Sequence, residues 1–574
     1  MKTYLNKINF IIGNTYRKKI IFLVVLLFIG MFFEILGLGS LLPVLSLIAS
    51  PETLKEFSFF NDIIFLNTLT YNYLVLLLLI CIGLIYLIKT LFLSYLTYRQ
   101  NRFLANVTAN ISNNLFELYL SQSYDYHVNI NSSKMLKNIQ TEVNLLGAFN
   151  FAVISLFVEL GLIFSILCTL IFIEPVGALS VSLFLGLLAY FFYRISKRKL
   201  SLWGQEREKA DSFIAKTLLE GLNGIKDIKL LHVESFFTSK FNDKQNYKAL
   251  ITSNSNTLSQ IPRYYLELIS VLGLVLFIIT MLLQNKDIPT LIATIGVFVA
   301  AVFRLIPSLN KILTAFQNIK FYSSSVDVIY NEFLSLRQKI SKNNNHRNNK
   351  MKGNILIKDL SFSYNLKLKS VFEKINLEIK IGETIGIIGS SGQGKSTFVD
   401  LLNGLFKPSA GKILVNELDI NNNLKSWNKN IGYVSQNIFL IDDTIEKNIV
   451  FGRDEEKIDK KALDKAIKNA QLNNFVSELP NGLNTMVGEN GIQISGGQKQ
   501  RIGIARALYH NPDVLIFDEA TSSLDVQTEK SIMDAIYSLR QKKIIIIVAH
   551  RLSTLNKCDK IFEIKENKIK QIIL

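Results

Sequence analysis

Six long apolar runs in the first 340 residues limit the folds open to this chain more than any other feature. Each is long enough to cross about 30 Å of hydrocarbon as a helix, and the remainder of the chain is different in character. We place the runs at 20–48, 73–97, 145–173, 176–195, 264–284 and 288–316. The first run is longer than the apolar region of a signal peptide and lacks a small-residue cleavage site, so we expect it to remain as a membrane helix.

Basic residues separate these runs. Residues 1–350 hold 33 Lys and Arg against 20 Asp and Glu, whereas residues 351–574 hold 31 against 26. A basic excess can indicate nucleic-acid binding, but basic residues between apolar runs are typical of the cytoplasmic loops of membrane proteins. The pattern therefore argues against a nucleic-acid partner. It predicts that the N-terminus, with Arg17, Lys18 and Lys19, is cytoplasmic and that segment 51–72 lies outside.

The cysteines have no metal-binding or redox spacing. We interpret Cys81, Cys168 and Cys558 as small hydrophobic residues in packed helices.

The polar stretches 98–144 and 196–263 keep apolar residues at helical spacing, so we expect the membrane helices to continue into the cytoplasm there. The segment 341–354 is rich in Asn and basic residues and predicts a flexible linker. Beyond it, apolar strands alternate with helices, which predicts an α/β domain with a largely parallel sheet. The expected domains are thus a membrane domain at 1–340, a linker at 341–354 and a second domain at 355–574.

A phosphate-binding motif lies in this second domain. Gly389 to Ser396 reads G-x-x-x-x-G-K-S, between an apolar strand and a helix. Such a loop wraps its N–H groups around phosphates, while the lysine adds a positive charge and the serine hydroxyl can bind Mg²⁺. The predicted phosphate contacts are Gly389, Ser390, Gly392, Gln393, Gly394, Lys395, Ser396 and Thr397.

Two acids end a second apolar strand, in the string VLIFDEATSSLD. Asp518 is suited to hold Mg²⁺, and Glu519 is suited to orient or deprotonate an attacking water. Two acids at the end of a strand could instead be merely solvated, but the phosphate-binding motif favours the catalytic interpretation.

The string ISGGQKQRIGIARAL, residues 494–508, closely resembles the signature segment of ATP-binding-cassette (ABC) transporters, with Ile in the place of the usual Leu. Further strings match other motifs of that family, around Gln436, Val487 to Gly491, Ser522 to Asp525 and His550. The resemblance implies that ATP and Mg²⁺ are cofactors, that Tyr364 stacks on adenine, and that Glu519, His550 and Gln436 are catalytic. It implies Mg²⁺ contacts from Ser396, Gln436 and Asp518, partly through water.

The same resemblance implies a head-to-tail pair of ATPase domains. Each ATP would lie between one phosphate loop and the signature turn of the other domain, formed by Ser495, Gly496, Gly497 and Gln498. A Ser-Gly-Gly turn before a helix offers N–H donors to a phosphate, which is consistent with this arrangement. We therefore expect a homodimer.

Six runs before an ATPase resemble the half-transporter arrangement of ABC exporters. The implied fold class is an all-α six-helix transmembrane domain of the type I/type IV exporter fold, followed by an α/β P-loop nucleotide-binding domain. The resemblance also implies short coupling helices near 123–132 and 224–241. His127 and His232 in these segments are interpreted as helix surface residues rather than ligands.

Ionisable residues lie within or beside the apolar runs, where charges are costly and face a cavity or a partner. Mutual pairing between helices, such as Glu34 with Arg304, is one interpretation. A substrate cavity is the other, and a basic Arg304 with a neighbouring Arg263 would then suit a phosphate-bearing substrate. The candidate cavity residues are Glu34, Arg263, Glu267 and Arg304; Glu159 is a further intramembrane acid.

The strings around Glu34, IPRYYLE and RLIPSLNKI look like those of bacterial flippases for lipid-linked oligosaccharides in protein glycosylation. This resemblance implies a protein of the bacterial inner membrane, in contact with membrane lipid, that carries a polyprenyl-pyrophosphate oligosaccharide to the outer leaflet. It also implies an amphipathic helix at 51–67 in the first outer loop. An ABC exporter of drugs, lipids or peptides is the alternative. A nucleotide-gated channel or regulator belongs to another class, and a soluble DNA-repair ATPase would lack the apolar runs.

Overall fold

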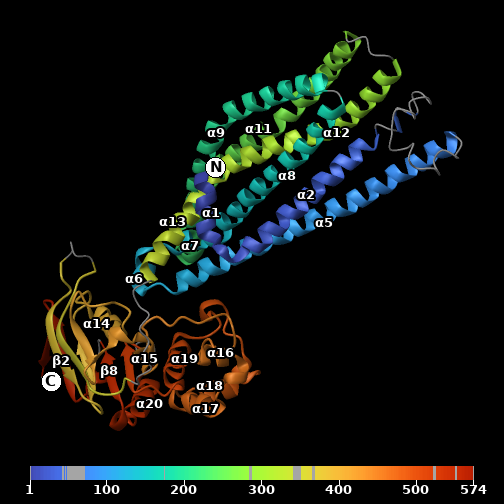
Figure 1. Cartoon of the computed structure of the whole chain (residues 1–574). Helices are drawn as coiled ribbons and strands as arrows, with labels where there is room; N and C mark the ends of the chain where they lie inside the picture. Colours follow the sequence, from blue (N-terminus) through green and yellow to red (C-terminus); the bar gives the residue numbers. More distant parts are fainter. Residues whose placement is uncertain are drawn as a thin grey trace. The chain divides into compact units, whose positions relative to one another are not determined.

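The computed structural model describes residues 2–41, 44–45, 47, 71–173, 175–283, 288–340, 351–364, 369–520, 525–549 and 552–572. The chain divides into two compact units. The first comprises residues 1–122 and 129–341, and the second comprises residues 123–128 and 342–574. Long helices make up the first unit, whereas strands and shorter helices make up most of the second (Figure 1).

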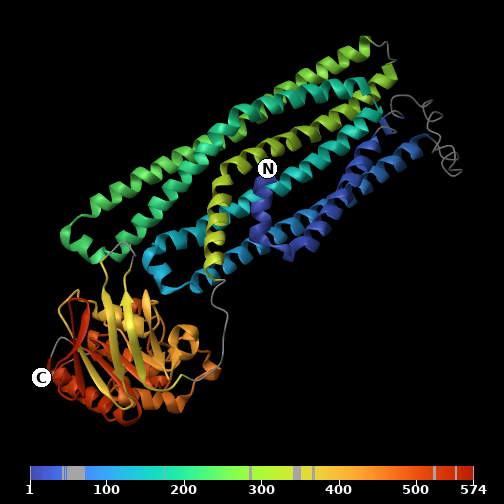
Figure 2. The same ribbon diagram turned by 60° about the vertical axis from the view of Figure 1, so that its left-hand side comes forward.

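The second unit contains a largely parallel sheet, as the sequence predicts. In its described part the order is β10-β9-β3-β8-β7-β6, and every neighbouring pair is parallel except β10 with β9. A second sheet, in the order β2-β1-β4-β5, is antiparallel, and Figure 2 shows both sheets. The strands are β1 (Ile355–Phe362), β2 (Phe372–Ile379), β3 (Thr384–Ile388), β4 (Ala410–Val415), β5 (Leu418–Asp419), β6 (Ile431–Val434), β7 (Val514–Asp518), β8 (Ile544–Val548), β9 (Lys560–Lys565) and β10 (Lys568–Ile572).

Two hydrophobic cores lie on opposite faces of the parallel sheet. Along β7, Leu515 and Phe517 belong to one core, while Val514 and Ile516 belong to the other. Because successive side chains of a strand point to opposite faces, a strand buried on both faces must be apolar throughout. The helices of this unit are α6 (Tyr124–Asn129), α14 (Lys395–Leu402), α15 (Leu424–Asn428), α16 (Ile445–Val450), α17 (Lys460–Asn469), α18 (Asn473–Glu478), α19 (Gly496–Tyr509) and α20 (Val526–Tyr537).

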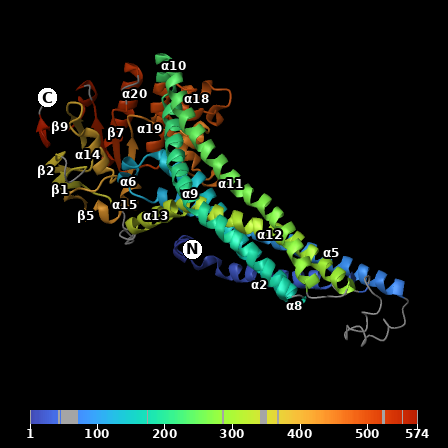
Figure 3. The ribbon, with the colours of Figure 1, turned by 90° about the horizontal axis from the view of Figure 1, so that it is seen from above.

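Long helices form the first unit, and Figure 3 shows them from above. In all three views α9 runs beside α11, and these two helices make extensive contact. The helices are α1 (Lys2–Ile12), α2 (Arg17–Gly39), α5 (Tyr71–Leu120), α7 (Ser132–Lys137), α8 (Val143–Ile173), α9 (Pro175–Asn223), α10 (Ile225–Leu231), α11 (Glu234–Leu283), α12 (Ile288–Phe321) and α13 (Ser323–Ile340); η4 (Asn138–Glu142) is a π-helical turn.

Most of the expected membrane spans coincide with these helices. Among the described residues, five segments are long and apolar enough to cross a membrane: Arg17–Gly39, Asn72–Leu120, Ser132–Phe172, Glu234–Leu283 and Thr294–Phe321. The fourth expected span, 176–195, lies in α9. Helices α5 and α11 have 50 residues each, about 75 Å of helix, and so continue well beyond a bilayer's thickness. The amphipathic helix expected at 51–67 lies outside the described residues.

Ion pairs hold the polar ends of the first unit's helices together. Lys137 Nζ lies 2.6 Å from Glu208 and 3.3 Å from Glu142, whose side chain is fully buried. Lys248 Nζ lies 2.6 Å from Asp211. We name this set the balanced cluster, because it contains three bases and three acids: Lys137, Arg207, Lys248, Glu142, Glu208 and Asp211.

A glycine allows α9 to approach the end of α12. A Cβ atom at Gly204 would overlap the carbonyl oxygen of Phe321. The approach is further fixed by Ser324, whose hydroxyl donates a 3.0 Å hydrogen bond to the Gly204 carbonyl. Only a residue without a side chain fits between these two backbones, so this site requires glycine for space rather than for conformation.

We expect Gly204→Ala to lower the apparent Tm of the purified protein, because overpacking costs about 1–3 kcal/mol and here the obstacle is backbone. Gly221→Ala is the matched control on the same helix, since its Cβ would meet Phe237 at 3.8 Å, an ordinary contact. Alanine is the better helix former by about 1 kcal/mol, so the control should be neutral or stabilising. Equal Tm values for the two variants would contradict the close approach of α9 to Phe321.

Candidate functional site

The phosphate loop connects β3 to α14. Gly392 and Gly394 have φ of +82° and +97°, which side chains rarely adopt, and Gly394 caps α14. A Cβ at Gly394 would lie 2.8 Å from Val371, so the loop also needs glycine there for space. The loop therefore ends on the N-terminus of α14, where free backbone N–H groups favour an anion.

Lys395 is the first residue of α14 and is buried. Its ammonium donates a 2.8 Å hydrogen bond to the Gly389 carbonyl, so the side chain folds back over the loop. Ser396 is exposed beside it, and the Gln393 side chain accepts a hydrogen bond from the Glu566 backbone N–H at 3.3 Å. The predicted phosphate residues thus form one continuous loop and helix start.

The two acids lie at the end of β7. Asp518 is buried, and Glu519 follows it with φ of +50°, a left-handed conformation that is uncommon outside glycine. A hydrogen bond of 3.0 Å from the Glu519 N–H to the Val548 carbonyl fixes this turn. Gln436 donates a 2.8 Å side-chain hydrogen bond to Glu519, so two of the predicted catalytic residues are in direct contact.

Strand order brings these elements to one place. β3, β8 and β7 are adjacent and parallel, so their carboxyl ends lie at the same edge of the sheet. The phosphate loop follows β3, the acids end β7, and Gln436 follows β6 on the other side of β7. Ligands in open α/β sheets bind at this edge.

The surroundings of Asp518 and of the nearby Asp400 disfavour their charged carboxylate forms. Burial, with a smaller effect from Glu519, raises the pKa of the Asp518 carboxyl, while the hydrogen bond from Tyr433 and the charge of Lys395 oppose the shift. Burial, together with the charge of Asp518, raises the pKa of Asp400 to about 6. A cation between these groups would relieve both effects.

Sequence reasoning missed Tyr433 and Asp400. The Tyr433 hydroxyl donates to Asp518 at 3.5 Å, and burial raises its pKa. Tyr433 lies in β6, three residues before Gln436, so the pairing of β6 with β7 would have indicated it. Nothing in the sequence around Asp400 indicates a role at this site, because it is one of several polar residues in the segment that forms the short helix α14.

Tyr364 lies next to the phosphate loop. Its hydroxyl is 2.7 Å from the hydroxyl oxygen of Thr397 on α14. The ring packs edge-on against Phe362 and Phe406, while 48% of the residue stays exposed. This leaves ring surface on which a planar base can stack.

The signature turn forms the start of α19. Ser495 accepts a 3.2 Å hydrogen bond from the Gln498 N–H, and the Gln498 side chain accepts one of 2.8 Å from the Ser495 N–H, which is a capping box. Ser495 and Gly496 are exposed. In the described part of the chain, no hydrogen bond, ion pair or ring contact joins this turn to the phosphate loop. One chain therefore brings together the predicted nucleotide-site residues that the structure describes, except this turn. His550 lies outside the described residues.

The residues predicted to hold Mg²⁺ fit that ion. Ser396, Gln436 and Asp518 all carry oxygen donors, which Mg²⁺ prefers, and Asp518 is a buried carboxylate in need of a cation. The described residues contain no group of three His, Cys, Asp or Glu that could hold a metal.

The intramembrane charges fall into separate groups. Glu34 is fully buried, and its two carboxylate oxygens lie 2.8 Å from Arg304 Nε and 3.1 Å from Lys89 Nζ. We name Glu34, Lys89 and Arg304 the membrane cluster. Lys89 was missed by the sequence analysis, although a lone cation inside an apolar span needs a partner.

The other charges pair elsewhere. Glu159 lies 2.8 Å from Lys311. Arg263 and Glu267, 3.0 Å apart, form an exposed pair one turn apart on α11. The structure thus brings together two of the four candidate cavity residues, Glu34 and Arg304, in the pairing that was one interpretation of the sequence.

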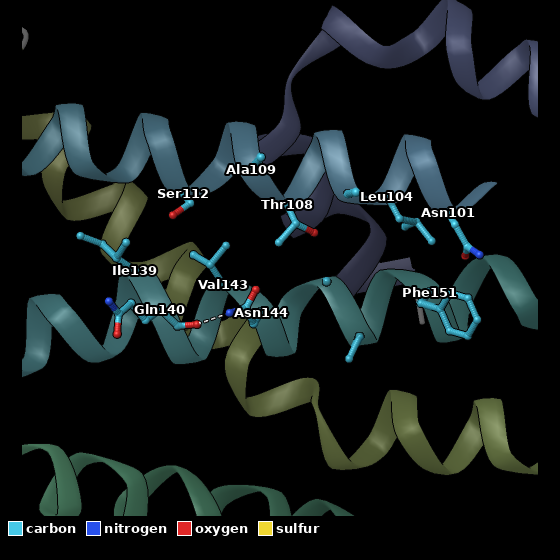
Figure 4. A pocket seen from close by; sticks show the side chains of 13 residues that line it. Asn101, Leu104, Thr108, Ala109, Ser112, Ile139, Gln140, Val143, Asn144 and Phe151 are labelled. Atoms are coloured by element: carbon cyan, nitrogen blue, oxygen red, sulfur yellow. Dashed lines mark hydrogen bonds between the residues drawn. The ribbon is translucent and has the colours of Figure 1, made fainter. Parts of the chain in front are cut away.

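An uncharged groove of about 820 Å³ lies between α5 and α8 (Figure 4). Uncharged polar side chains, including Thr108, Ser112 and Asn144, line it together with apolar ones such as Leu104 and Phe151. Asn144 donates a hydrogen bond to the Gln140 carbonyl. None of its lining residues is ionisable. The groove therefore offers no charge to a phosphate and contains none of the candidate residues.

Both units of the chain match models of known protein families. The ABC transporter family model matches residues 372–522, and the model of the ABC transporter transmembrane region matches residues 19–303. An ATP-dependent lipid A-core flippase of Saccharophagus degradans is 31% identical over 478 residues, which cover 81% of this chain and 78% of the relative. Its counterpart in Francisella tularensis subsp. holarctica is 32% identical over 405 residues, covering 68% and 65%.

A solved structure has the same fold. It is a bacterial Atm1-family ABC exporter with ATP bound, similar with a TM-score of 0.78 at 21% sequence identity, covering 97% of this chain and 95% of that one. The predicted fold class, membrane helices followed by an α/β ATPase, is confirmed. A phosphate loop and acids at one sheet edge, in a chain whose other unit matches the transporters' membrane region, are those of an ATP-dependent translocase, and this multi-pass membrane protein belongs to the ABC transporter family.

Proposed function

We propose that this chain forms a homodimer that flips a lipid-linked oligosaccharide, a polyprenyl-pyrophosphate glycan, from the inner to the outer leaflet of the bacterial inner membrane. The N-terminus and the ATPase would then lie in the cytoplasm. One observation carries the choice of a phosphate-bearing lipid: the membrane cluster has two cations for one carboxylate.

The charge balance of this cluster argues for an anionic cargo. Glu34 can neutralise one of its two partners, so Lys89 and Arg304 leave one positive charge within the helices expected to span the membrane. An unbalanced charge inside a membrane protein is costly and faces a partner or a water-filled path. Arg304 keeps 31% of its side chain exposed and is the member through which a phosphate could approach.

Lipid A-core is the second candidate cargo. Two relatives named for flipping it are 31% and 32% identical to this chain. The strings around Glu34 favour the oligosaccharide, and the relatives favour lipid A-core, so the two must be compared directly.

The proposed ATP site is shared between two chains. One chain would supply Tyr364 for adenine and the phosphate loop with Lys395, while the partner subunit would supply its signature turn. The exposed Ser495 turn supports this, since the N-terminus of α19 can offer N–H groups to an anion supplied by a second chain. Closure of the two domains on ATP would then shift the population of membrane-domain conformations.

Hydrolysis would depend on Glu519. Its carboxylate would accept a proton from the attacking water as the bond between the β and γ phosphates breaks. Gln436 would orient this carboxylate through their hydrogen bond, and His550, which follows β8 in the sequence, would assist. Mg²⁺ held by Ser396, Gln436 and Asp518 would offset charge on the phosphates when bound.

Glu519→Gln should therefore lower the ATPase rate by about 10²- to 10⁴-fold, the usual contribution of a general base, while ATP still binds. The measurement is phosphate release at saturating ATP, together with equilibrium binding of ATP. Glu478→Gln, an exposed acid at the end of α18, is the matched control and should keep the normal rate. A normal rate in Glu519→Gln would remove this residue from the mechanism.

A mixed dimer tests the shared site. Chains with Lys395→Ala and chains with Ser495→Arg should each give an inactive homodimer. In the mixed dimer both changes fall in one of the two sites, and the other site is intact, so ATPase activity should return. Two affinity tags isolate the mixed species, and phosphate release is measured. A mixed dimer as inactive as either parent would contradict a site built from two chains.

Cargo is tested by flipping in reconstituted vesicles. Labelled polyprenyl-pyrophosphate oligosaccharide, lipid A-core and an ordinary phospholipid are compared with and without ATP, and we expect movement of the first. Lys89→Gln removes the surplus positive charge but keeps the Glu34–Arg304 pair, so it should slow flipping by about 10-fold or more while basal ATPase stays normal.

Arg263→Gln, in the exposed pair on α11, is the control and should flip normally. Movement of lipid A-core alone would replace the proposed cargo with the second candidate. Movement of phospholipid alone, or unchanged flipping in Lys89→Gln, would refute recognition of phosphate by the membrane cluster.

A further inference from the structure

A continuous row of aromatic rings joins α6 to the proposed adenine site. Tyr124 of α6 packs against Phe406 with ring centroids 5.5 Å apart, and Phe406 packs against Tyr364 at 5.4 Å. Phe362 of β1 contacts both Phe406 and Tyr364, at 5.5 and 5.1 Å. The ring planes of these pairs are inclined by 40° to 88°, the range of tilted and edge-to-face packing, which is favourable between aromatic side chains.

The burial of this row is graded. Phe406 and Phe362 are 5% exposed, whereas Tyr364 and Tyr124 at the two ends are 48% and 44% exposed. The two phenylalanines are therefore fixed by their surroundings. Tyr364 packs on both of them and Tyr124 packs on Phe406, and each tyrosine is partly exposed. The free side of Tyr364 is the surface proposed for adenine.

Besides Phe362, two groups contact Tyr364. Its hydroxyl is held by Thr397, which follows the phosphate loop on α14. Its ring edge is held by Phe406, which lies between α14 and β4. A shift of Phe406 would therefore rotate the Tyr364 ring about its hydroxyl contact, and so tilt the surface on which the base stacks.

Helix α6 contributes to the second unit although the rest of the chain around it does not. Residues 123–128 belong to the second unit, while the helices that precede and follow them in sequence, α5 and α7, belong to the first. Tyr124 is thus the point at which a segment between two helices of the membrane unit contacts a ring that supports the nucleotide site.

We propose that Phe406 is a positioning residue for the nucleotide base and that Tyr124 sets its position, so that the placement of α6 and the affinity for the base are coupled. The inference rests on the proposed role of Tyr364 in stacking on adenine. Because such coupling is reciprocal, binding of the base must also stabilise the docked position of α6.

In this proposal the row of rings affects binding of the base and not of the phosphates. A ligand that has the phosphates but no base therefore tests it. The full-length protein is assayed for the KM for ATP, for kcat, and for competitive inhibition by tripolyphosphate, which has the phosphates but no base. Phe406→Leu keeps an apolar side chain and Tyr124→Leu changes a half-exposed one, so both should fold; Tm is measured to check this. Each should raise the KM for ATP by about 2- to 10-fold, the value of one aromatic pair, with kcat and the tripolyphosphate inhibition constant unchanged.

Two controls separate the possible failures. Tyr364→Leu should raise the KM for ATP and spare tripolyphosphate; if it leaves the KM unchanged, the proposed stacking role fails and the inference with it. Val128→Ala, at an exposed position of α6, should have a normal KM. If Tyr364→Leu behaves as expected but Phe406→Leu or Tyr124→Leu leaves the KM unchanged, the positioning role is refuted while the stacking role stands.

A further outcome would also overturn the inference. Equal losses of ATP and tripolyphosphate affinity in Phe406→Leu would mean that the ring supports the phosphate loop instead. The reciprocal effect is measured by amide hydrogen exchange of residues 123–129. ATP should slow their exchange in the wild-type protein, and this protection should be reduced in Phe406→Leu; equal protection in the two would contradict the coupling.

Discussion

The parallel pairing of β3, β8 and β7 is the constraint on which the nucleotide site depends. The phosphate loop binds anions through its backbone N–H groups and Lys395, whereas the acids that complete the site are more than 120 residues away in sequence. Parallel strands end at one edge, so the pairing of β3 with β8 and of β8 with β7 brings Lys395 and Asp518 to the same place. The left-handed turn at Glu519 is held by a hydrogen bond to Val548, the last residue of the strand between them.

Much of this could be predicted from the sequence, because motifs specify local backbone. The string from Gly389 to Ser396 fixes a loop at a helix start wherever it occurs, and an all-apolar strand such as β8 indicates burial on both faces. The contacts of Tyr433 with Asp518, and of Tyr364 with Thr397, could not be predicted in the same way. They depend on strand order and on side-chain direction across the sheet, which one sequence does not state.

In the membrane unit, too, the sequence predicted the elements but not the contacts between distant residues. The apolar runs predicted the spans, since length and composition decide whether a helix can cross a bilayer. They did not predict which charges would meet. Glu34 and Arg304 are 270 residues apart, and the pairing was only one of two interpretations. Lys89 joins the cluster from a third helix, and the residues around it in the sequence do not indicate that it contacts Glu34.

The two groups of buried charges in this unit differ in their net charge. In the balanced cluster each base has an acid, so the net charge is zero and the cost of burial is offset by ion pairs between α7, η4, α9 and α11. In the membrane cluster, three helices contribute two bases and one acid. Ion pairing alone accounts for the first group. It accounts for only one of the two cations in the second group, because one cation neutralises Glu34. The Lys89 ammonium also lies 4.8 Å from the centroid of the Tyr86 ring, and the proposed anionic cargo would offset the remaining charge.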